Sequence, residues 1–196
     1  MIDKILKFDS DLFLFLNGLG QSSFDIFWIS LSEPEFNVIV YLTALIIYIR
    51  SKKNKVNHNL VYLITIFFSI IILIIIADQS SNFSKDFFQR LRPCYNEVIM
   101  DSVRLVKDSC GGKYSFFSAH ASNSFSLAVF FGLLFRRDSR LLLYFFTFIA
   151  LLISYSRIYL GVHYPIDILV GGFLGVLNGF VIYKAFLYSL NSFNKS

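Results

Sequence analysis

The chain has 196 residues, of which 56% are hydrophobic and 18% aromatic, and it carries a formal net charge of +5. With a mean hydropathy of +0.62, this composition excludes an ordinary soluble domain and is typical of a membrane protein. The positive residues lie in short loops between apolar runs and form no aromatic-interleaved patch, which argues against a nucleic-acid-binding module.

The first 34 residues are predicted to form an amphipathic or re-entrant entry to the membrane. Residues 5–19 place apolar side chains on one helical face and Lys7, Asp9 and Asp11 on the other, the pattern of a helix that lies in the interface. The alternative is a sixth span built from these pieces, with a kink at Pro34. The charges also interrupt any signal-peptide core, so we expect the N-terminus to be kept.

Five apolar segments are predicted to cross the membrane as helices. The clearest, residues 60–77, is about 27 Å long as a helix, against roughly 30 Å of hydrocarbon. Its β-branched residues favour strands in water, but a segment in lipid must satisfy its own backbone hydrogen bonds. The five segments are residues 36–49, 60–77, 121–135, 141–154 and 166–187. The predicted fold is therefore an all-α, polytopic membrane helical bundle, with five to six helices spanning or lying in the membrane as one domain.

Basic residues between the spans set the predicted orientation. By the positive-inside rule, the loops that carry them face the cytoplasm. These residues are Arg50, Lys52, Lys53 and Lys55, then Arg136, Arg137 and Arg140, and finally Lys184 and Lys195. The outward loop and helix at residues 78–117 then share the opposite face with residues 156–163. We expect a protein of the inner (cytoplasmic) membrane whose polar site faces the periplasm or the exterior.

A glycine repeat marks one face of the last predicted span. Gly171, Gly175 and Gly179 recur every fourth residue. Because such a stripe lets two helix backbones approach closely, we interpret it as a helix-packing surface with no chemical role.

A cluster of charged side chains, Arg157, His163 and Asp167, lies beside this apolar segment. Each would cost about 2.5–3.5 kcal/mol at the centre of a membrane helix, so the cluster is predicted to face a polar ligand. Pro165 fits a first helical position, with Tyr164 at the cap, so His163 lies just outside the helix and Asp167 in its first turn. An imidazole placed there suits a nucleophile or base toward an anion; a structural hydrogen bond is the alternative.

Two further segments carry groups suited to an anion. Lys85 and Arg92 are seven residues apart, or two helical turns, and are predicted to share one face of a helix that ends at Pro93. A solvated basic face is the alternative. The second segment opens the predicted span at residue 121, where backbone N–H groups bind anions readily. It consists of Ser118, Ala119 and His120.

Together these motifs resemble those of the type 2 phosphatidic acid phosphatases, membrane lipid-phosphate phosphatases related to class A acid phosphatases and vanadium haloperoxidases. The family pattern is Lys-x6-Arg-Pro, then Pro-Ser-Gly-His, then Ser-Arg-x5-His-x3-Asp. The first motif is complete from Lys85 to Pro93, and the third from Ser156 to Asp167. The second reads Phe-Ser-Ala-His at residues 117–120. The resemblance implies the helical core of the acid-phosphatase and haloperoxidase family.

The resemblance also implies a role for each matching residue. His163 would attack phosphorus and form a phosphohistidine, held in its reactive tautomer by Asp167, while His120 would act as general acid and then general base. Five residues would hold the phosphate: Lys85, Arg92, Ser118, Ala119 and Arg157. Neither a cofactor nor a metal ion is implied. Ala119 in place of glycine keeps the backbone N–H but adds a methyl group beside the phosphate.

The implied activity is hydrolysis of a phosphate or diphosphate on a lipid headgroup, with membrane lipids as the partners and no nucleic acid. Undecaprenyl diphosphate is the favoured substrate. Lipid A, phosphatidylglycerol phosphate and phosphatidic acid are alternatives, as is phosphoryl transfer to another lipid. A non-catalytic transporter or scaffold is the alternative from a different class, because the second motif is altered.

Two cysteines, Cys94 and Cys110, lie in the outward loop between the first two motifs. If that face is oxidising they can pair, which would stabilise the loop by about 3 kcal/mol in the chain-entropy model. Two cysteines define no disulfide framework, however, so free thiols remain the alternative.

Overall fold

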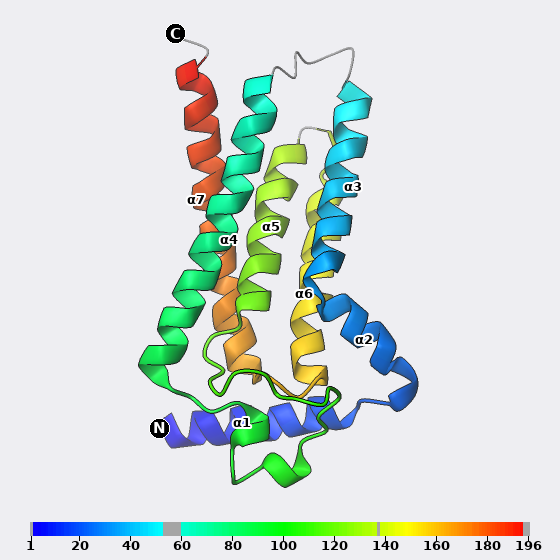
Figure 1. Ribbon diagram of the computed structural model, residues 1–196, viewed down its shortest axis with the longest axis vertical. Coiled ribbons are helices and arrows are strands. Elements are labelled where there is room, and N and C mark those ends of the chain that lie inside the picture. The colour runs from blue at the N-terminus through cyan, green and yellow to red at the C-terminus, as the bar shows by residue number, and fades with distance from the viewer. Residues whose placement is uncertain (1, 53–59, 137, 194–196) are drawn as a thin grey trace.

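The computed structural model describes residues 2–52, 60–136 and 138–193 (Figure 1). The α-helices of these ranges are α1 (Ile2–Gly18), α2 (Asp25–Ser32), α3 (Pro34–Lys52), α4 (Leu60–Phe88), α5 (Ala119–Phe135), α6 (Leu141–Tyr159) and α7 (Pro165–Phe193). Short 3₁₀ helices form η1 (Ser22–Phe24), η2 (Pro93–Tyr95) and η3 (Met100–Ser102). The only β-pairing in the described ranges is an isolated bridge between Leu91 and Tyr114. The predicted all-α fold class is confirmed.

Helices α3 to α7 run side by side as a bundle, and α1 lies across one end of it (Figure 1). Helix α5 packs against α7, α6 and α4, with its most extensive contact to α7. The loop after α4 and the loop between α6 and α7 both lie at the α1 end (Figure 1). The three predicted motifs therefore lie at one end of the bundle.

The helix ends that flank the predicted basic loops lie at the opposite end of the bundle: α3 and α5 end there, and α4 and α6 begin there (Figure 1). Arg50 ends an apolar stretch of α3, and Arg136 and Arg140 flank the connection from α5 to α6. Four other residues of the predicted basic set lie outside the described residues: Lys53, Lys55, Arg137 and Lys195. The described cations are separated from the motifs by the length of the bundle.

Three helices of the described chain, α4, α6 and α7, are individually long and apolar enough to cross a bilayer. Helix α5 is apolar but has only 17 residues, and α3 has 19 residues but carries charges near both ends, at Glu35, Arg50 and Lys52. Both nevertheless run beside the three longer helices (Figure 1). The chain is thus a helical membrane bundle, in which three of the five segments expected to span do so by length and composition alone.

The N-terminal helices α1 and α2 do not run parallel to the helices of the bundle (Figure 1). Helix α1 and the segment Ser22–Ser32, which contains η1 and α2, meet at 83°, which is the geometry of a broken span or a re-entrant loop. The bend lies between Gly18 and Ser22, and a second break at Glu33 precedes the first residue of α3, Pro34. The first 34 residues therefore do not form one straight helix.

Glycines bring α7 into backbone contact with α5. A Cβ atom built on Gly171, Gly175 or Gly179 would lie 2.5, 2.4 or 2.4 Å from a backbone oxygen of α5 or its cap. Those oxygens belong to Ser118, Ser122 and Ser126. The predicted packing role of the glycine repeat is confirmed. Because the contact begins at Ser118, it also holds the start of α5 against the start of α7.

Helix α4 departs from the sequence prediction at its C-terminal end. Lys85 and Arg92 were expected on one helix ending at Pro93, but α4 ends at Phe88. Gln89 adopts φ 47°, in the left-handed region, and Arg92 has extended backbone angles. The Arg92 N–H donates to the carbonyl of Lys113 at 3.0 Å, so the chain after α4 pairs with the loop before α5.

Candidate active site

His163 lies in the loop between α6 and α7, just before the helix begins at Pro165. Its side chain is 2% exposed, and its Nδ1 lies 3.4 Å from Oδ2 of Asp167. The backbone N–H of Tyr164 donates to the same oxygen at 3.0 Å, so Asp167 lies in the first turn as predicted. Burial lowers the pKa of His163 to about 4, although Asp167 acts in the opposite direction. The imidazole is therefore neutral at pH 7.

The separation of 3.4 Å between His163 and Asp167 is longer than a normal N–H···O hydrogen bond. Accordingly, Nδ1 of His163 is buried and makes no hydrogen bond within the described part of the chain. The carboxylate still lies close enough to orient the ring, and such contacts commonly tighten when a substrate binds. With Nδ1 turned to Asp167, Nε2 remains for chemistry.

Asp167 is held in turn by a network that the sequence did not reveal. Arg90 donates from Nη1 to Oδ1 of Asp167 at 2.8 Å and from Nη2 to Oδ2 of Asp9 at 2.6 Å. Asp9 also accepts from the backbone N–H of Ile166 at 2.9 Å. The network links α1, the loop after α4 and the first turn of α7, so it fixes the carboxylate that faces His163.

Asp9 itself departs from the prediction for α1. It was placed on the polar, outward face of an interfacial helix together with Lys7 and Asp11. The structure buries Asp9, which is 1% exposed, whereas Lys7 and Asp11 are exposed. The reason is its charge-assisted pairing with Arg90, since a buried carboxylate needs a partner.

The start of α5 forms a second wall of the site. Ser118 caps this helix, because its Oγ accepts from the N–H of Ala121 at 3.4 Å. The Ser118 N–H donates to the carbonyl of Asp167 at 3.1 Å, which joins the second and third motifs directly. In the described chain this leaves the first-turn N–H groups of Ala119 and His120 for an anion.

Three cations surround this region. Lys85 is close enough to Arg92 and Arg157 to be repelled by both, and it also interacts with Asp167. Burial lowers the pKa of Arg92 from its ordinary value. Clustered cations that are partly desolvated are stabilised by a bound anion. The arrangement is therefore suited to a phosphate group.

Each of the two arginines uses only part of its guanidinium group in hydrogen bonds to the protein. Arg92 donates from Nε to the carbonyl of Tyr114 at 3.2 Å and from Nη1 to the carbonyl of Cys110. Arg157 donates from Nη1 to Oγ of Ser32, while its Nε is buried without a hydrogen-bond partner among the described residues. A buried donor left unpaired costs about 1–3 kcal/mol, so an oxygen anion placed at this Nε would stabilise the site.

His120 faces the same cations. The groups that interact with its imidazole electrostatically are Arg157, His163 and Lys85. Members of all three motifs thus meet around one point. The structure brings together every residue predicted to act in catalysis or phosphate binding: Lys85, Arg92, Ser118, Ala119, His120, Arg157, His163 and Asp167. Among the described residues, no group of three or more His, Cys, Asp or Glu side chains is arranged to hold a metal ion.

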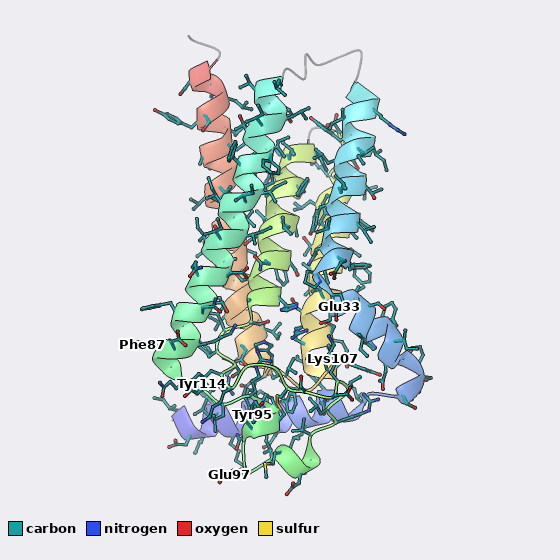
Figure 2. All side chains as sticks on the ribbon, in the orientation of Figure 1. Glu33, Phe87, Tyr95, Glu97, Lys107 and Tyr114 are labelled. Carbon is teal, nitrogen blue, oxygen red and sulfur yellow. A yellow bond between two sulfur atoms is a disulfide. The ribbon has the colours of Figure 1, made fainter. Side chains whose placement is uncertain are left out.

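The loop between α4 and α5 covers this end of the bundle. Cys94 and Cys110 are bonded to each other in the structure, with their Cα atoms 6.3 Å apart. Lys107 forms an ion pair of 2.5 Å with Glu33, just before α3. Figure 2 shows Tyr95, Lys107 and Tyr114 at the α1 end. The loop is thereby tied to itself and to the N-terminal segment, next to Arg92.

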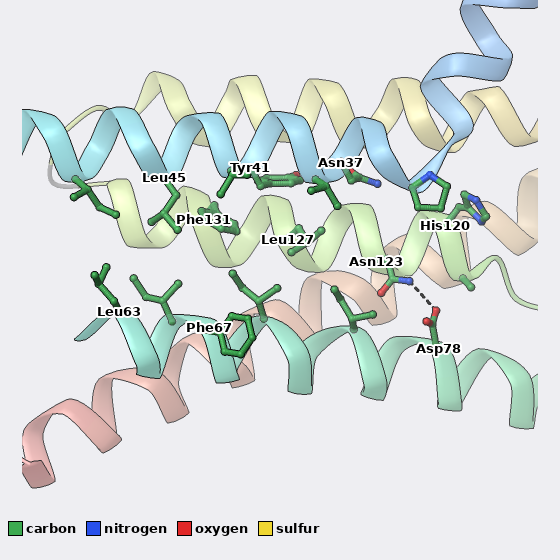
Figure 3. Close-up of a pocket in the computed structure, with 18 residues that line it drawn as sticks. Asn37, Tyr41, Leu45, Leu63, Phe67, Asp78, His120, Asn123, Leu127 and Phe131 are labelled. Atoms are coloured by element: carbon green, nitrogen blue, oxygen red, sulfur yellow. Dashed lines mark hydrogen bonds between the residues drawn. The ribbon is translucent and has the colours of Figure 1, made fainter. Parts of the chain in front are cut away.

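A groove of about 770 Å³ leads away from His120 between α3, α4 and α5 (Figure 3). Ala119 and His120 line one end of it, together with polar side chains. The remainder is lined mainly by apolar and aromatic side chains, including Tyr41, Leu45, Leu63, Phe67, Leu127 and Phe131. Its shape and lining suit a lipid chain attached to a phosphate at the bundle end.

Sequence reasoning missed Asp9, Arg90 and Ser32 as parts of the site. Arg90 stands only two residues before the motif arginine, but its partners Asp9 and Asp167 are 81 and 77 residues away. Ser32, which accepts from Arg157, lies in a segment that carries no motif. No local pattern singles out these residues, because their roles depend on contacts between distant helices.

The PAP2 superfamily pattern matches residues 62–190. The chain is 34% identical over 193 residues to the lipid A 4'-phosphatase of Porphyromonas gingivalis, covering 96% of this chain and 77% of that protein. It is 37% identical over 185 residues to the lipid A 4'-phosphatase of Bacteroides thetaiotaomicron, covering 93% and 79% respectively.

Two crystal structures have a similar fold. For Aquifex aeolicus LpxE the TM-score is 0.64 at 24% identity, over 89% of this chain and 93% of that one. For a PAP2 type phosphatidylglycerolphosphate phosphatase from Bacillus subtilis it is 0.63 at 20% identity, over 95% and 87%. At these identities the likeness concerns the fold.

Proposed function

The chain belongs to the PAP2 superfamily as an integral membrane lipid phosphatase, and we propose that it removes the 4'-phosphate from lipid A. The proposal rests on one structural observation, a buried cluster of cations and histidines that opens into an apolar groove. The names of the two relatives support lipid A over undecaprenyl diphosphate, which the sequence analysis favoured. Membership of a hydrolase family also argues against a non-catalytic scaffold.

In the proposed first step, Nε2 of His163 attacks phosphorus. The new N–P bond forms as the bond from phosphorus to the sugar oxygen breaks, and His120 donates a proton to that oxygen. The neutral state of His163 supports this role, because only the unprotonated nitrogen has a lone pair to donate. Asp167, held by Arg90, stabilises the ring as it gains positive charge.

In the proposed second step, water displaces His163 from phosphorus. His120, left unprotonated by the first step, removes a proton from the water as the N–P bond breaks. Inorganic phosphate then leaves. Both steps move negative charge onto the equatorial phosphate oxygens, where Lys85, Arg92 and Arg157 would bind it together with the Ala119 N–H and the Ser118 hydroxyl.

The proposed orientation follows from the separation of charges along the bundle. The described basic residues Arg50 in the last part of α3, Arg136 after α5 and Arg140 before α6 lie at the end opposite the site (Figure 1). The positive-inside rule assigns that end to the cytoplasm. We therefore place the protein in the inner membrane, with its site facing the periplasm, where the groove admits a lipid from the outer leaflet.

The proposal is tested by phosphate release from purified protein in mixed micelles. Lipid A, undecaprenyl diphosphate and phosphatidylglycerol phosphate are compared at matched surface concentration, and the dephosphorylated sugar is identified by mass spectrometry. We expect the highest kcat/KM on lipid A, with loss of the phosphate at the 4' position. A higher kcat/KM on undecaprenyl diphosphate, or loss of the other lipid A phosphate, contradicts the proposal.

A further inference from the structure

Three polar side chains form a collar at the head of the groove, next to His120. They are Asn37 from α3, Asp78 from α4 and Asn123 from α5. Figure 3 shows all three at the same end as His120, with the apolar lining extending away from them. Asn123 follows His120 by three residues, or about 4.5 Å along the helix axis. The collar therefore lies about one helical turn from His120, on the groove side of the site.

The collar presents hydrogen-bond acceptors. Asn123 donates from Nδ2 to Oδ1 of Asp78 at 2.8 Å, which fixes its amide and leaves its Oδ1 as the outward group. The Oδ1 atoms of Asn123 and Asn37 are both buried without a hydrogen-bond partner in the described chain. Unpaired buried oxygens are unfavourable, so the collar is stabilised by a ligand that brings donors to it.

Candidate lipid phosphates differ in what they offer at this depth. A prenyl diphosphate continues directly from its phosphate into hydrocarbon, with no donor. A diacylglycerol phosphate offers ester oxygens, which only accept. An acylated amino sugar offers hydroxyl and amide N–H donors at the junction between carbohydrate and acyl chain. Phosphatidylglycerol phosphate offers a single glycerol hydroxyl, so among these lipids the amino sugar alone brings several donors, enough for both free oxygens of the collar.

We propose that Asn37, Asp78 and Asn123 determine substrate specificity by accepting hydrogen bonds from the hydroxyl or amide groups of an acylated amino sugar whose phosphate lies at His163. The inference rests on the proposed function and adds the residues that select the substrate. A site built to bind donors rejects an analogue that lacks them, because its own polar groups then remain buried and unpaired.

The experiment compares Asn37→Leu with wild type on lipid A and on undecaprenyl diphosphate. Asn37 is the first choice because its Oδ1 has no hydrogen-bond partner among the described residues, so the change removes an acceptor without breaking a recorded bond. We expect kcat/KM on lipid A to fall about tenfold, the effect of losing one hydrogen bond in a buried site. The kcat/KM on undecaprenyl diphosphate should change by less than about twofold.

Gln79→Leu is the matched control. Gln79 follows Asp78 on α4 but is exposed and does not line the groove, so both activities should stay at the wild-type level. If Asn37→Leu does not fold, Asn123→Ala is compared in the same way. An equal fall in kcat/KM on both lipids, or no change in kcat/KM on either, overturns the specificity proposal and leaves the proposed function standing. If the wild-type protein releases no phosphate from lipid A, the proposed function is wrong, and the proposed role of the collar in substrate specificity is wrong with it.

Discussion

Arg90 donates to Asp167 at 2.8 Å, so a residue outside the three motifs holds the carboxylate that faces His163. Because Arg90 is itself bound by Asp9 of α1, the helix across the end of the bundle forms part of the support of the site. Arg90 acts through Asp167 and does not lie among the groups proposed to bind phosphate. It is therefore a positioning residue.

Replacement of Arg90 should reduce turnover more than binding. In Arg90→Gln we expect kcat on a soluble aryl phosphate to fall by about 10- to 100-fold, since a misplacement near 1 Å at a reacting group can cost a factor of 100. KM should change by less than about threefold, because the phosphate-binding cations are untouched. Steady-state kinetics with both parameters determined measure the effect.

The matched pair for this prediction lies on α1. Asp9→Asn removes the charge that binds Arg90 and should lower kcat in the same direction, whereas Asp11→Asn changes an exposed carboxylate and should have no effect. Wild-type kcat in Arg90→Gln, or a change in KM alone, would show that the network does not position His163.

The pKa of His163 predicts how the site responds to acid. Burial lowers this pKa from 6.5 to about 4, so the neutral ring persists as the pH falls from 7 to 5. The lowered pKa also makes the free energy of unfolding depend on pH. The contribution of His163 is fully present above pH 6.5 and is lost as the pH falls toward 4, because His163 in the unfolded chain takes up a proton first. In a titration of ¹⁵N-labelled histidine followed by NMR, the His163 signal, identified by its loss in His163→Gln, should show a midpoint far below 6.5. A midpoint at 6.5 or higher disagrees with the buried, neutral ring.

The glycine contact between α5 and α7 predicts a packing defect. In Gly175→Ala the new Cβ would lie 2.4 Å from the backbone oxygen of Ser122, which cannot move aside as a side chain does. Overpacking of this kind costs about 1–3 kcal/mol, so the melting temperature in detergent should fall. Gly18→Ala is the control, since nothing lies within 4 Å of its Cβ position. Equal melting temperatures for the two variants would show that the two helix backbones do not approach this closely at Gly175.

The bonded cysteines predict a stabilised loop beside Arg92. Alkylation of the unfolded, unreduced protein should leave Cys94 and Cys110 unmodified, as measured by intact mass. Cys94→Ser should lower stability by about 3 kcal/mol in the chain-entropy model. It should also raise KM, because Arg92 donates to the Cys110 carbonyl. Two alkylated thiols in unreduced protein would show that the pair is free in solution.

The sequence predicted those features that local chemistry determines. Pro165 sets the start of α7, and the spacing from His163 to Asp167 then places both groups at its first turn. The recurrence of Gly171, Gly175 and Gly179 on one face is enough to identify a packing surface. The three motifs are local patterns too, so each could be found without knowledge of the fold.

Features that depend on distant partners were not predicted. Arg92 was expected to follow Lys85 on a helix, but the left-handed Gln89 and pairing with residues near Tyr114 end that helix early. Asp9 was read as a surface charge because its partner Arg90 is 81 residues away. Helical periodicity shows which residues share a face, but it does not show which face another helix covers.

The most direct test of the account is isolation of the covalent intermediate. His120→Ala removes the proposed base for the second step, so after mixing with a labelled aryl phosphate, whose leaving group needs no proton from His120, and a rapid quench, the label should accumulate on the protein. Peptide mapping should find an acid-labile phosphoryl group on His163, and His163→Ala should carry none. Label on another residue, or phosphate released by His163→Ala at the wild-type rate, would contradict the central claim that this imidazole receives the phosphoryl group.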